Sequence, residues 1–542
     1  MFTFKNYFIG GGTIKQWTVF KHNGPMFPPE YVPHKIPIIV KNKNIVLPPL
    51  AEEYATMFAK YIDTKYYEIN NFRKNFWKDF KPTLGNIDIN SLEEIDFSLI
   101  KKHLEKEKEK NKLITKEEKD RIKNKQLKEE EPYMYCIIDG TQQKVGNYKI
   151  EPPGIFLGRG FHPKLGRIKT RTYPEDVTLN LDKESQIPKP LDGHKWNTII
   201  HDNTVIWLAT WKDNITGKNK YIFTSLESFF KSKSDEEKFD LAKKLKRKIN
   251  SIRETYEKEL ENNDLKKKQL ATALYLIDNL ALRVGGKKDS KEQADTVGVT
   301  SLRVEHISLL DNNIIKLDFL GKDSIRYCRK VSVHSKVYEN LKDFIKNKSK
   351  KEELFDLITS SSLNEYLDSF MKGLTAKVWR TYNASFIFQK ELDKLTSSKK
   401  LEMFTEKEER LHFLISIFNQ ANTEVALLCN HQKAVTTNLD NSIEKIDIKI
   451  KELKKKRDKY KESKNNEKVL KTTKKIQLLK VKKESKLKMK NVSLGTSKQN
   501  YIDPRIVFAF IKKYDIPPEK IMTEKLVTRF QWASIVDKDY RF

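Results

Sequence analysis

The stretch LATALYLIDNLALRVG, residues 270–285, lies where the pattern of the chain changes. Its apolar run ends at glycines, which predicts a buried helix that stops there. Before it, residues 131–228 contain short runs such as YMYCIID and VIWLATW that are typical of strands. After it, the runs IIKLDFL and SIRYCRKVSV flank GKD, which indicates a hairpin, and helical patterns resume as far as residue 436. The chain is therefore predicted to be an α+β protein of several domains.

The charge of the chain points to a polyanionic partner. Lysine and arginine number 105 against 74 acidic residues, for a formal net charge of +31 over 542 residues. The usual partner for such an excess is nucleic acid. The alternative is a lysine bias in the source proteome, visible in runs such as KKKRDKYKESKNNEK. An aromatic content of 11% and patterned apolar segments favour a folded protein over a basic tail.

The cysteines and the hydropathy of the chain indicate the cellular compartment in which the protein works. Cys136, Cys328 and Cys429 lie far apart with no CxxC pair, which fits a reducing compartment with neither disulfides nor a cysteine-built metal site. No apolar run approaches the roughly 18 residues of a membrane helix. The start, MFTFKNYFIGGG, lacks the pattern of a secretory signal. We therefore expect a soluble intracellular protein with no membrane partner.

Two segments are dominated by charge. Residues 99–130 are almost purely charged and predict a solvated helical excursion. In residues 437–490, apolar side chains first follow a 3-4-3 spacing, with Arg457 at a skipped position, and the apolar line lapses at SKNNEK and then resumes, which predicts an antiparallel helical hairpin with a weak seam. A disordered lysine tract is the alternative for this basic spacer. The residues of the predicted seam are Ile443, Ile446, Ile450, Leu453, Tyr460, Val469, Ile476, Leu479 and Leu487.

The pattern divides the chain into four parts. The predicted domains are 1–228, 229–436, 437–490 and 491–542. The last of them is predicted to be a small helical domain with its own aromatic core, formed by Phe508, Phe510, Phe530 and Trp532.

A single tyrosine in the stretch SLGTSKQNYIDPR, residues 493–505, is a candidate nucleophile. Asp503 and Pro504 are a typical N-cap and first residue of a helix. Tyr501 therefore precedes a helix N-terminus, where backbone N–H groups and the helix dipole favour an anion. A phenol there could attack a phosphodiester. The alternative is a packing or surface role, because the chain has 21 tyrosines.

Such a tyrosine needs cationic companions. Guanidinium groups are suited to the charge that gathers on the non-bridging oxygens in the transition state. Arg283 is predicted to end the apolar helix and to be held there by packing, and Arg380 lies in a helix-like run. A leaving 5′ oxygen needs a general acid, and Lys322, at the tip of the predicted hairpin, can reach outward into a groove. His431 closes the run EVALLCNHQK. Each residue alone would be an ordinary cap, ion pair or solvated side chain.

Ten stretches, from about residue 10 to the end, share their wording and order with one known family. They are GPMFPPEY, FRKNFWKDF, KIEPPGIFLGRGFHPKLG, TYPED, GHKWNTIIHDNTVIWLATW, ADTVGVTSLRVEHI, FLGKDSIRY, GLTAKVWRTYNAS, LLCNHQK and LGTSKQNYIDPR. By these words the chain resembles eukaryotic-type DNA topoisomerase IB.

The resemblance implies a mechanism. Tyr501 would attack one DNA strand and form a 3′-phosphotyrosyl bond, while Arg283, Arg380 and His431 hold the scissile phosphate. Lys322 would donate a proton to the departing 5′-hydroxyl. The broken strand would rotate about the intact one and be resealed, so neither ATP nor a metal is needed. The sequence agrees, because it has no Walker-type loop and no clustered metal ligands, and no cofactor is expected.

The resemblance also implies further DNA contacts. Asn500 and Asp323 match positions where camptothecin-type inhibitors enter the nicked complex. Leu157 and Gly286 depart from the family pattern, as does almost all the wording of the spacer. Positions that match family DNA contacts are Arg159, which would enter the groove beside the cleavage site, and Lys220, Tyr221, Lys238, Lys288, Thr296, Asn364 and Lys377.

The implied architecture is a bilobed clamp that closes as a monomer around double-stranded DNA. A strand-rich N-terminal lobe with cap and mixed α/β subdomains, residues 1–228, would face a mainly helical catalytic lobe that resembles tyrosine recombinases. Binding would be largely independent of base sequence, because phosphate contacts position a protein without specifying bases. The family's charged N-terminal region is missing here, so nuclear import is left to basic runs such as KKLKRK or to sequence outside this chain.

The implied activity is the relaxation of positive and negative supercoils in support of replication and transcription in the nucleus. Two other classes remain. A tyrosine recombinase shares the arginine, lysine, histidine and tyrosine set, and a non-enzymatic protein could bind DNA through charge alone.

Overall fold

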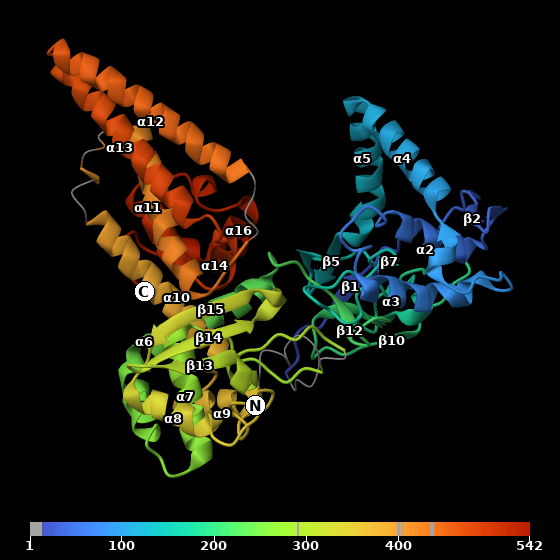
Figure 1. Ribbon diagram of the computed structural model, residues 1–542, viewed down its shortest axis with the longest axis horizontal. Coiled ribbons are helices and arrows are strands. Elements are labelled where there is room, and N and C mark those ends of the chain that lie inside the picture. Colours follow the sequence, from blue (N-terminus) through green and yellow to red (C-terminus); the bar gives the residue numbers. More distant parts are fainter. Residues whose placement is uncertain (1–13, 290–291, 398–400, 403, 405, 434–437) are drawn as a thin grey trace. The chain divides into compact units, whose positions relative to one another are not determined.

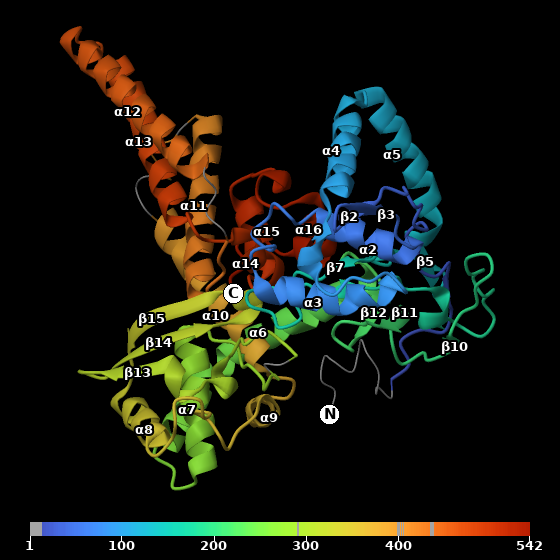
Figure 2. The ribbon, with the colours of Figure 1, turned by 45° about the vertical axis from the view of Figure 1, so that its right-hand side comes forward.

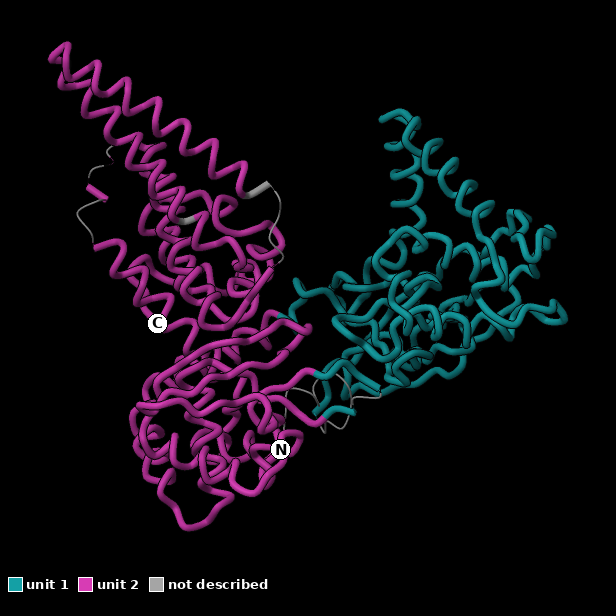
Figure 3. The backbone as a smooth tube through the Cα atoms, viewed as in Figure 1, with its two compact units in different colours: residues 1–231, 288–295 teal, residues 232–287, 296–542 magenta. Residues whose placement is uncertain are grey.

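The computed structural model describes residues 14–289, 292–397, 401–402, 404, 406–433 and 438–542. The chain forms two compact units (Figure 3). The first comprises residues 1–231 and 288–295, and the second comprises residues 232–287 and 296–542. The mixed α+β class, strand-rich toward the N-terminus and mainly helical toward the C-terminus, is confirmed. The four-part division of the chain stays a prediction.

The first unit combines short strands with helices (Figure 1). Its strands are β1 Phe20–His22, β2 Ile38–Val40, β3 Lys43–Ile45, β4 Ile95–Asp96, β5 Tyr135–Ile138, β6 Thr141–Lys144, β7 Gly154–Ile155, β8 Ile168–Lys169, β9 Thr178–Asn180, β10 Thr198–Ile200, β11 Trp207–Lys212 and β12 Asn219–Phe223. They pair in the orders β1-β5-β6, β3-β2-β4, β7-β8 and β10-β9-β11-β12. The β9 and β10 strands are parallel and the other pairs are antiparallel.

Helices of the first unit differ sharply in burial. The helices are α2 Pro49–Ala59, α3 Asn70–Phe80, α4 Ser98–Leu113 and α5 Lys116–Glu130. Phe58 of α2 stacks on Phe76 of α3 with ring centroids 4.1 Å apart, at the centre of a phenylalanine-rich core. The charged residues 99–130 form α4 and α5, which diverge from the joint between them (Figures 1 and 2). Only Ile100 is buried in α4 and no side chain is buried in α5, as the near absence of apolar residues predicts.

The second unit is mainly helical around one antiparallel sheet of order β13-β14-β15. Its strands are β13 Ile307–Leu310, β14 Ile314–Leu320 and β15 Arg326–Ser332. Its helices are α6 Phe229–Glu259, whose first residues belong to the other unit, α7 Leu265–Leu280, α8 Ser335–Ile345, α9 Ser360–Phe370, α10 Ala376–Thr396, α11 Lys407–Leu428, α12 Asn438–Glu462, α13 Asn466–Lys488, α14 Leu494–Asn500, α15 Pro504–Lys513 and α16 Glu524–Arg529. The predicted β14–β15 hairpin is confirmed.

The helix predicted over residues 270–285 ends earlier than its apolar pattern indicates. The α7 helix stops at Leu280, because Ala281 adopts a left-handed conformation with φ of 49°. Arg283 therefore lies beyond the helix, not at its end. Its carbonyl accepts a hydrogen bond from Val299 N over 2.9 Å, so backbone pairing with a distant segment holds it.

The predicted hairpin over the basic spacer is confirmed in α12 and α13 (Figure 1). Ile446, Ile450 and Ile476 form a small buried cluster, against which Leu453 and Leu479 pack. Leu487 is 48% exposed and lies outside this cluster. The hairpin begins and ends at one place, since Lys433 N donates to Asn491 O over 3.0 Å.

The predicted separate core of the C-terminal segment is wrong. Phe508, Phe510 and Phe530 belong to the same large cluster as α7, α10 and α11, and Trp532 packs on it. Phe530 and Trp532 lie 6.3 and 6.2 Å from Phe239 of α6. The segment is too short to enclose these rings by itself, so it shares the core of the preceding helices.

Candidate active site

Tyr501 lies between two helices of the second unit and is only 5% exposed. It caps the C-terminus of α14, a helix that the sequence pattern does not indicate. The predicted start of α15 is confirmed, with Pro504 first and the Asp503 carboxylate accepting from Arg505 N. Ser385 Oγ of α10 donates to Tyr501 O over 3.1 Å and accepts from Asp503 N over 3.0 Å. The tyrosine backbone is thus fixed to the core on both sides.

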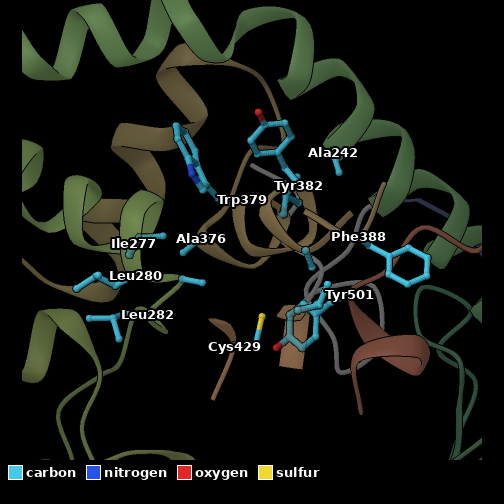
Figure 4. Close-up of a cluster of buried hydrophobic side chains, with 14 of the residues drawn as sticks. Ala242, Ile277, Leu280, Leu282, Ala376, Trp379, Tyr382, Phe388, Cys429 and Tyr501 are labelled. Atoms are coloured by element: carbon cyan, nitrogen blue, oxygen red, sulfur yellow. The ribbon is translucent and has the colours of Figure 1, made fainter. Parts of the chain in front are cut away.

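Two arginines hold the phenol oxygen. Arg283 Nη1 donates to Tyr501 Oη over 3.1 Å, and Arg380 Nη1 does so over 3.4 Å. The Arg380 guanidinium also lies over the tyrosine ring, 4.9 Å from its centroid. Arg380 is 3% exposed, and its Nη2 donates to Cys429 O over 3.4 Å. Figure 4 shows Tyr501 beside Cys429 at the edge of the surrounding apolar cluster.

The two guanidinium groups are close enough to affect each other. Burial, and then the positive charge of Arg380, lower the pKa of Arg283 from its ordinary value. Arg283 remains cationic, because its guanidinium pKa starts far above neutrality. Two buried like charges repel, and an anion between them would relieve that repulsion.

His431 follows α11 and lies against the same tyrosine. Its ring stacks on that of Tyr501 with centroids 5.3 Å apart, and Nδ1 is 2.8 Å from Ser497 Oγ of α14. Burial, and then the charges of Arg380 and Arg283, lower the pKa of His431 to about 3, so the imidazole is neutral near pH 7. Within the described residues, its buried Nε2 and the Nε of Arg380 have no hydrogen-bond partner.

Lys322 lines a cavity of about 160 Å³ with Arg283, Arg380 and His431. As predicted, it occupies the tip between β14 and β15 and is exposed there. Asp323, next in the chain, also lines the cavity and has a φ of 66°. All five residues proposed for the chemistry therefore meet at one place in the second unit.

Lys238 lies in a different environment from the one expected for a DNA contact. It is 4% exposed, and its ammonium donates to Asn500 O over 3.1 Å and pairs with Asp235 at 3.3 Å. Arg529 pairs with the same carboxylate at 2.7 Å. In this structure the Lys238 side chain braces the residue before Tyr501, and its contact with DNA stays a prediction.

Further residues predicted to contact DNA belong to the second unit. Asn500, the last residue of α14, donates from Nδ2 to Thr496 O over 3.2 Å. Asn364 Oδ1 of α9 accepts from Ala376 N over 3.1 Å and so orders the start of α10. Lys377, in the first turn of α10, is exposed, and Thr296 is 7% exposed.

The other predicted contacts belong to the first unit. Arg159 is exposed in the loop after β7, and Lys220 and Tyr221 lie on β12. Lys220 pairs with Asp213 at 3.7 Å. Burial, and then the charge of Lys218, lower the pKa of Lys288. DNA binding by all these residues stays a prediction.

Ser385 and Ser497 also position residues of the site, although no pattern in the sequence predicts them. Both lie inside stretches quoted for the family resemblance, GLTAKVWRTYNAS and LGTSKQNYIDPR. Neither serine has a spacing that would mark it, because each acts across more than 60 residues of chain, on Tyr501 and on His431.

Neither a cluster of metal ligands nor a membrane-spanning helix occurs among the residues that the structure describes. Among them, no group of three or more His, Cys, Asp or Glu side chains gathers as metal ligands would. None of the helices described has the length and apolar character required to cross a bilayer.

Fold and site together define a class of proteins: those with a tyrosine held by two arginines and a histidine on a mainly helical unit. Three family models match in succession, namely Eukaryotic DNA topoisomerase I, DNA binding fragment over residues 15–224, Eukaryotic DNA topoisomerase I, catalytic core over 227–464, and C-terminal topoisomerase domain over 473–542. The chain belongs to the eukaryotic DNA topoisomerase I family.

Curated relatives agree with this assignment. The chain is 42% identical to DNA topoisomerase 1 beta of Arabidopsis thaliana, over 98% of this chain and 60% of the relative. It is 42% identical to DNA topoisomerase 1 of Caenorhabditis elegans, with 97% and 68% covered. For DNA topoisomerase 1 of Homo sapiens the identity is 40%, with 97% and 72% covered. The chain thus spans about 60 to 72% of the length of these relatives.

Proposed function

We propose that this chain is a type IB DNA topoisomerase that relaxes positive and negative supercoils without ATP or a metal. The observation that carries the proposal is the pair of arginine hydrogen bonds to Tyr501 Oη, from Arg283 and Arg380. Guanidinium groups aimed at one oxygen stabilise its anionic form, and a phenolate is the nucleophile that the reaction needs.

In the cleavage step, the Tyr501 hydroxyl gives its proton to water, the phenolate Oη attacks a phosphodiester phosphorus, and the bond to the 5′ oxygen breaks. Arg283 and Arg380 hold the non-bridging oxygens, and His431 Nε2, buried and without a partner among the described residues, donates a hydrogen bond to one of them. That role requires the tautomer protonated at Nε2, in which Nδ1 accepts from Ser497 Oγ. Lys322 protonates the leaving 5′ oxygen.

Resealing reverses these steps after the free strand has rotated. The 5′-hydroxyl attacks the phosphotyrosine, Lys322 takes back a proton, and Tyr501 leaves. The energy of the broken bond is kept in the 3′-phosphotyrosyl linkage, so no external energy source enters.

The partner we propose is double-stranded DNA, bound by a monomer that closes around it and with little preference for base sequence. The support is the formal net charge of +31 and the match of residues 15–224 to a DNA binding fragment. On the basis of family membership we also propose a catalytic lobe of tyrosine-recombinase type, a nuclear location and service to replication and transcription. Camptothecin-type inhibitors are proposed to enter beside Asp323 and Asn500.

Relaxation of a supercoiled plasmid in EDTA without ATP tests the proposal, with Tyr501→Phe as the matched variant. We expect the wild-type chain to relax the plasmid and the variant to bind it without relaxing it. A nicked suicide substrate should give a covalent adduct at the 3′ side that maps to Tyr501. Relaxation by Tyr501→Phe would refute the mechanism, binding without relaxation by the wild type would favour a DNA-binding protein, and intermolecular strand exchange would favour a recombinase.

A further inference from the structure

Phe161 is the most exposed of the large apolar side chains in the described part of the chain, with 93% of its surface open to solvent. It lies two residues after Arg159, in the loop between β7 and β8. Single exposed apolar residues are common on protein surfaces, so exposure alone does not indicate a site. Phe161 differs from such residues because its loop is fixed by hydrogen bonds and packing and because the loop carries cationic side chains.

The loop that carries Phe161 is anchored on both sides. Asn75 Nδ2 of α3 donates to Pro163 O and to Leu165 O, each over 2.8 Å. Gly166 lies so close to α3 that a Cβ there would be 2.1 Å from Phe72 O, which makes a side chain impossible at that position. Two backbone hydrogen bonds of 2.8 Å, Phe156 N to Arg167 O and Gly166 N to Phe156 O, close the base of the loop.

Apolar packing holds the same loop from beneath. Leu165 is 5% exposed and belongs to the core shared by α2 and α3, and Leu157 packs on that core. The Phe156 ring meets the His162 ring edge-on, with centroids 4.8 Å apart. Leu157, Leu165 and the paired rings of Phe156 and His162 therefore fix the loop, and the ring of Phe161 is exposed on it.

The loop also carries cations. Lys164 Nζ donates to Ile215 O over 2.7 Å and pairs with Glu292, which joins the loop to the turn before β12 and to the segment 288–295. Lys169, which follows the loop on β8, pairs with Glu151, and burial, and then the charge of Lys220, lower its pKa to about 8. An exposed aromatic ring two residues after the exposed Arg159 matches a ligand that is anionic outside and apolar inside, as duplex DNA is.

We propose that Phe161 is an aromatic wedge that enters a groove of the bound duplex next to Arg159 and packs against a base step. This inference rests on the proposed function and adds a residue that reads DNA shape. Wedges of this kind partly unstack a step, and the energy needed is smallest at flexible pyrimidine–purine steps. Cleavage should therefore favour positions where such a step meets Phe161, even though the phosphate contacts themselves carry no base preference.

The first test measures unstacking without any chemistry. The Tyr501→Phe chain is titrated with duplexes that carry 2-aminopurine at one position each, scanned along the bound site. We expect a rise in fluorescence of about threefold or more at one step, because unstacking relieves quenching. Adding Phe161→Ala should abolish the rise at equal occupancy, and Phe161→Leu should keep part of it. The matched control is Leu113→Ala, which alters a side chain 82% exposed at the end of α4.

A second test maps cleavage sites on an end-labelled fragment with the wild-type chain and Phe161→Ala. We expect the variant to lose at least about threefold of the preference for pyrimidine–purine steps while it still relaxes plasmid. Superimposable site maps, or an equal 2-aminopurine signal in Phe161→Ala, would overturn the wedge and assign the ring to another partner. Failure of the proposed function would be seen separately, as a wild-type chain that binds no duplex or forms no adduct.

Discussion

The cations around Tyr501 in the second unit and Lys220 of the first unit are held in opposite ways. In the second unit, Arg380 and Lys238 are 3% and 4% exposed, and both are bonded to protein groups around Tyr501. In the first unit, the Lys220 side chain is 42% exposed and shares the carboxylate of Asp213. Buried cations have one geometry and act on a single point, whereas exposed cations are mobile and screened by salt. Burial, and not the presence of a positive charge alone, therefore distinguishes cations that act in the reaction from cations that contribute to affinity.

Burial of so much like charge has an electrostatic cost that the reaction can use. Burial, and then the charge of Arg380, lower the pKa of Arg283, and burial, followed by the charges of Arg380 and Arg283, lowers the pKa of His431. A phosphate between them would offset this repulsion, and a pentavalent phosphorus with more negative charge would offset it further. The buried groups should therefore affect rate, and the exposed groups affinity and its salt dependence.

The largest expected effect comes from changing the buried arginines without changing their charge. Arg380→Lys and Arg283→Lys keep one positive charge but lose the planar fork, so we expect cleavage to slow by about 1,000-fold. Single-turnover formation of the covalent adduct on a suicide substrate measures this. The salt dependence of DNA binding should stay as in the wild type. A variant with normal cleavage and weakened binding would break the contrast between the two units.

Substitution of one buried and one exposed lysine should give a smaller effect and should separate cleavage rate from the salt dependence of binding. Lys238→Met removes the hydrogen bond to Asn500 O, and a shift of the nucleophile by a fraction of an ångström should slow cleavage about 10- to 100-fold. Lys220→Met should leave the cleavage rate at saturation unchanged and lower the salt slope of binding by about one.

The cleavage rate at saturation reports whether a lysine positions Tyr501, and the salt slope of binding reports whether its charge contacts DNA. If Lys238→Met lowered the salt slope as Lys220→Met does while cleavage at saturation stayed normal, Lys238 would contact DNA as the family resemblance implies. The buried position would then be specific to the free protein.

The pH dependence of stability gives a smaller effect. His431 has a pKa of about 3 in the folded chain against 6.5 ordinarily, so between these values the unfolded chain binds a proton that the folded chain does not. Stability must therefore fall as pH drops below about 6.5. From pH 7 to pH 5 the wild type should lose on the order of 1 to 2 kcal/mol more than His431→Asn.

Urea unfolding at the two pH values measures this difference. Equal losses in the wild type and in His431→Asn would mean that His431 is charged in the folded protein. The buried cationic cluster would then be less dehydrated than its burial indicates.

The smallest effect on activity is expected from the α12–α13 hairpin, whose cations are exposed like those of the first unit. Ile450→Asp places a charge in the cluster with Ile446 and Ile476, so the hairpin should open and become sensitive to protease. Relaxation should fall by no more than about threefold, because the tyrosine is held by the core. Ile448→Asp, at a position 51% exposed on the same helix, is the control. Loss of cleavage in Ile450→Asp would show that the hairpin positions Tyr501.

Local signals in the sequence were enough to predict several features of the site. Asp503 and Pro504 mark the start of α15, and the GKD tripeptide marks the tip that carries Lys322. These features depend on a few adjacent residues, so a local pattern contains what decides them. The gathering of Arg283, Arg380, His431 and Tyr501 came from the family resemblance and not from their spacing, because no local rule brings such distant residues together.

Other features depend on distant partners that no local pattern reveals. The α7 helix ends early where Ala281 turns left-handed and the following strand-like segment pairs with residues near 299. Lysine usually lies on the surface, but Lys238 is buried because it pairs with Asp235 and donates to Asn500 O. The aromatic rings of the C-terminal segment find their core on α6 and α11. In each case tertiary packing overrides a local preference.

The closing of the hairpin at its base has a consequence for how this chain can vary over evolutionary time. Gln432 and Val492 form an antiparallel bridge, and Ser493 N donates to His431 O over 2.8 Å. The residues that leave the core and those that return to it are thus neighbours, whatever lies between them. Insertions, deletions and many substitutions in α12 and α13 can therefore accumulate without displacing Tyr501. A module inserted in this way is free to drift, while the chemistry on either side of it stays under selection.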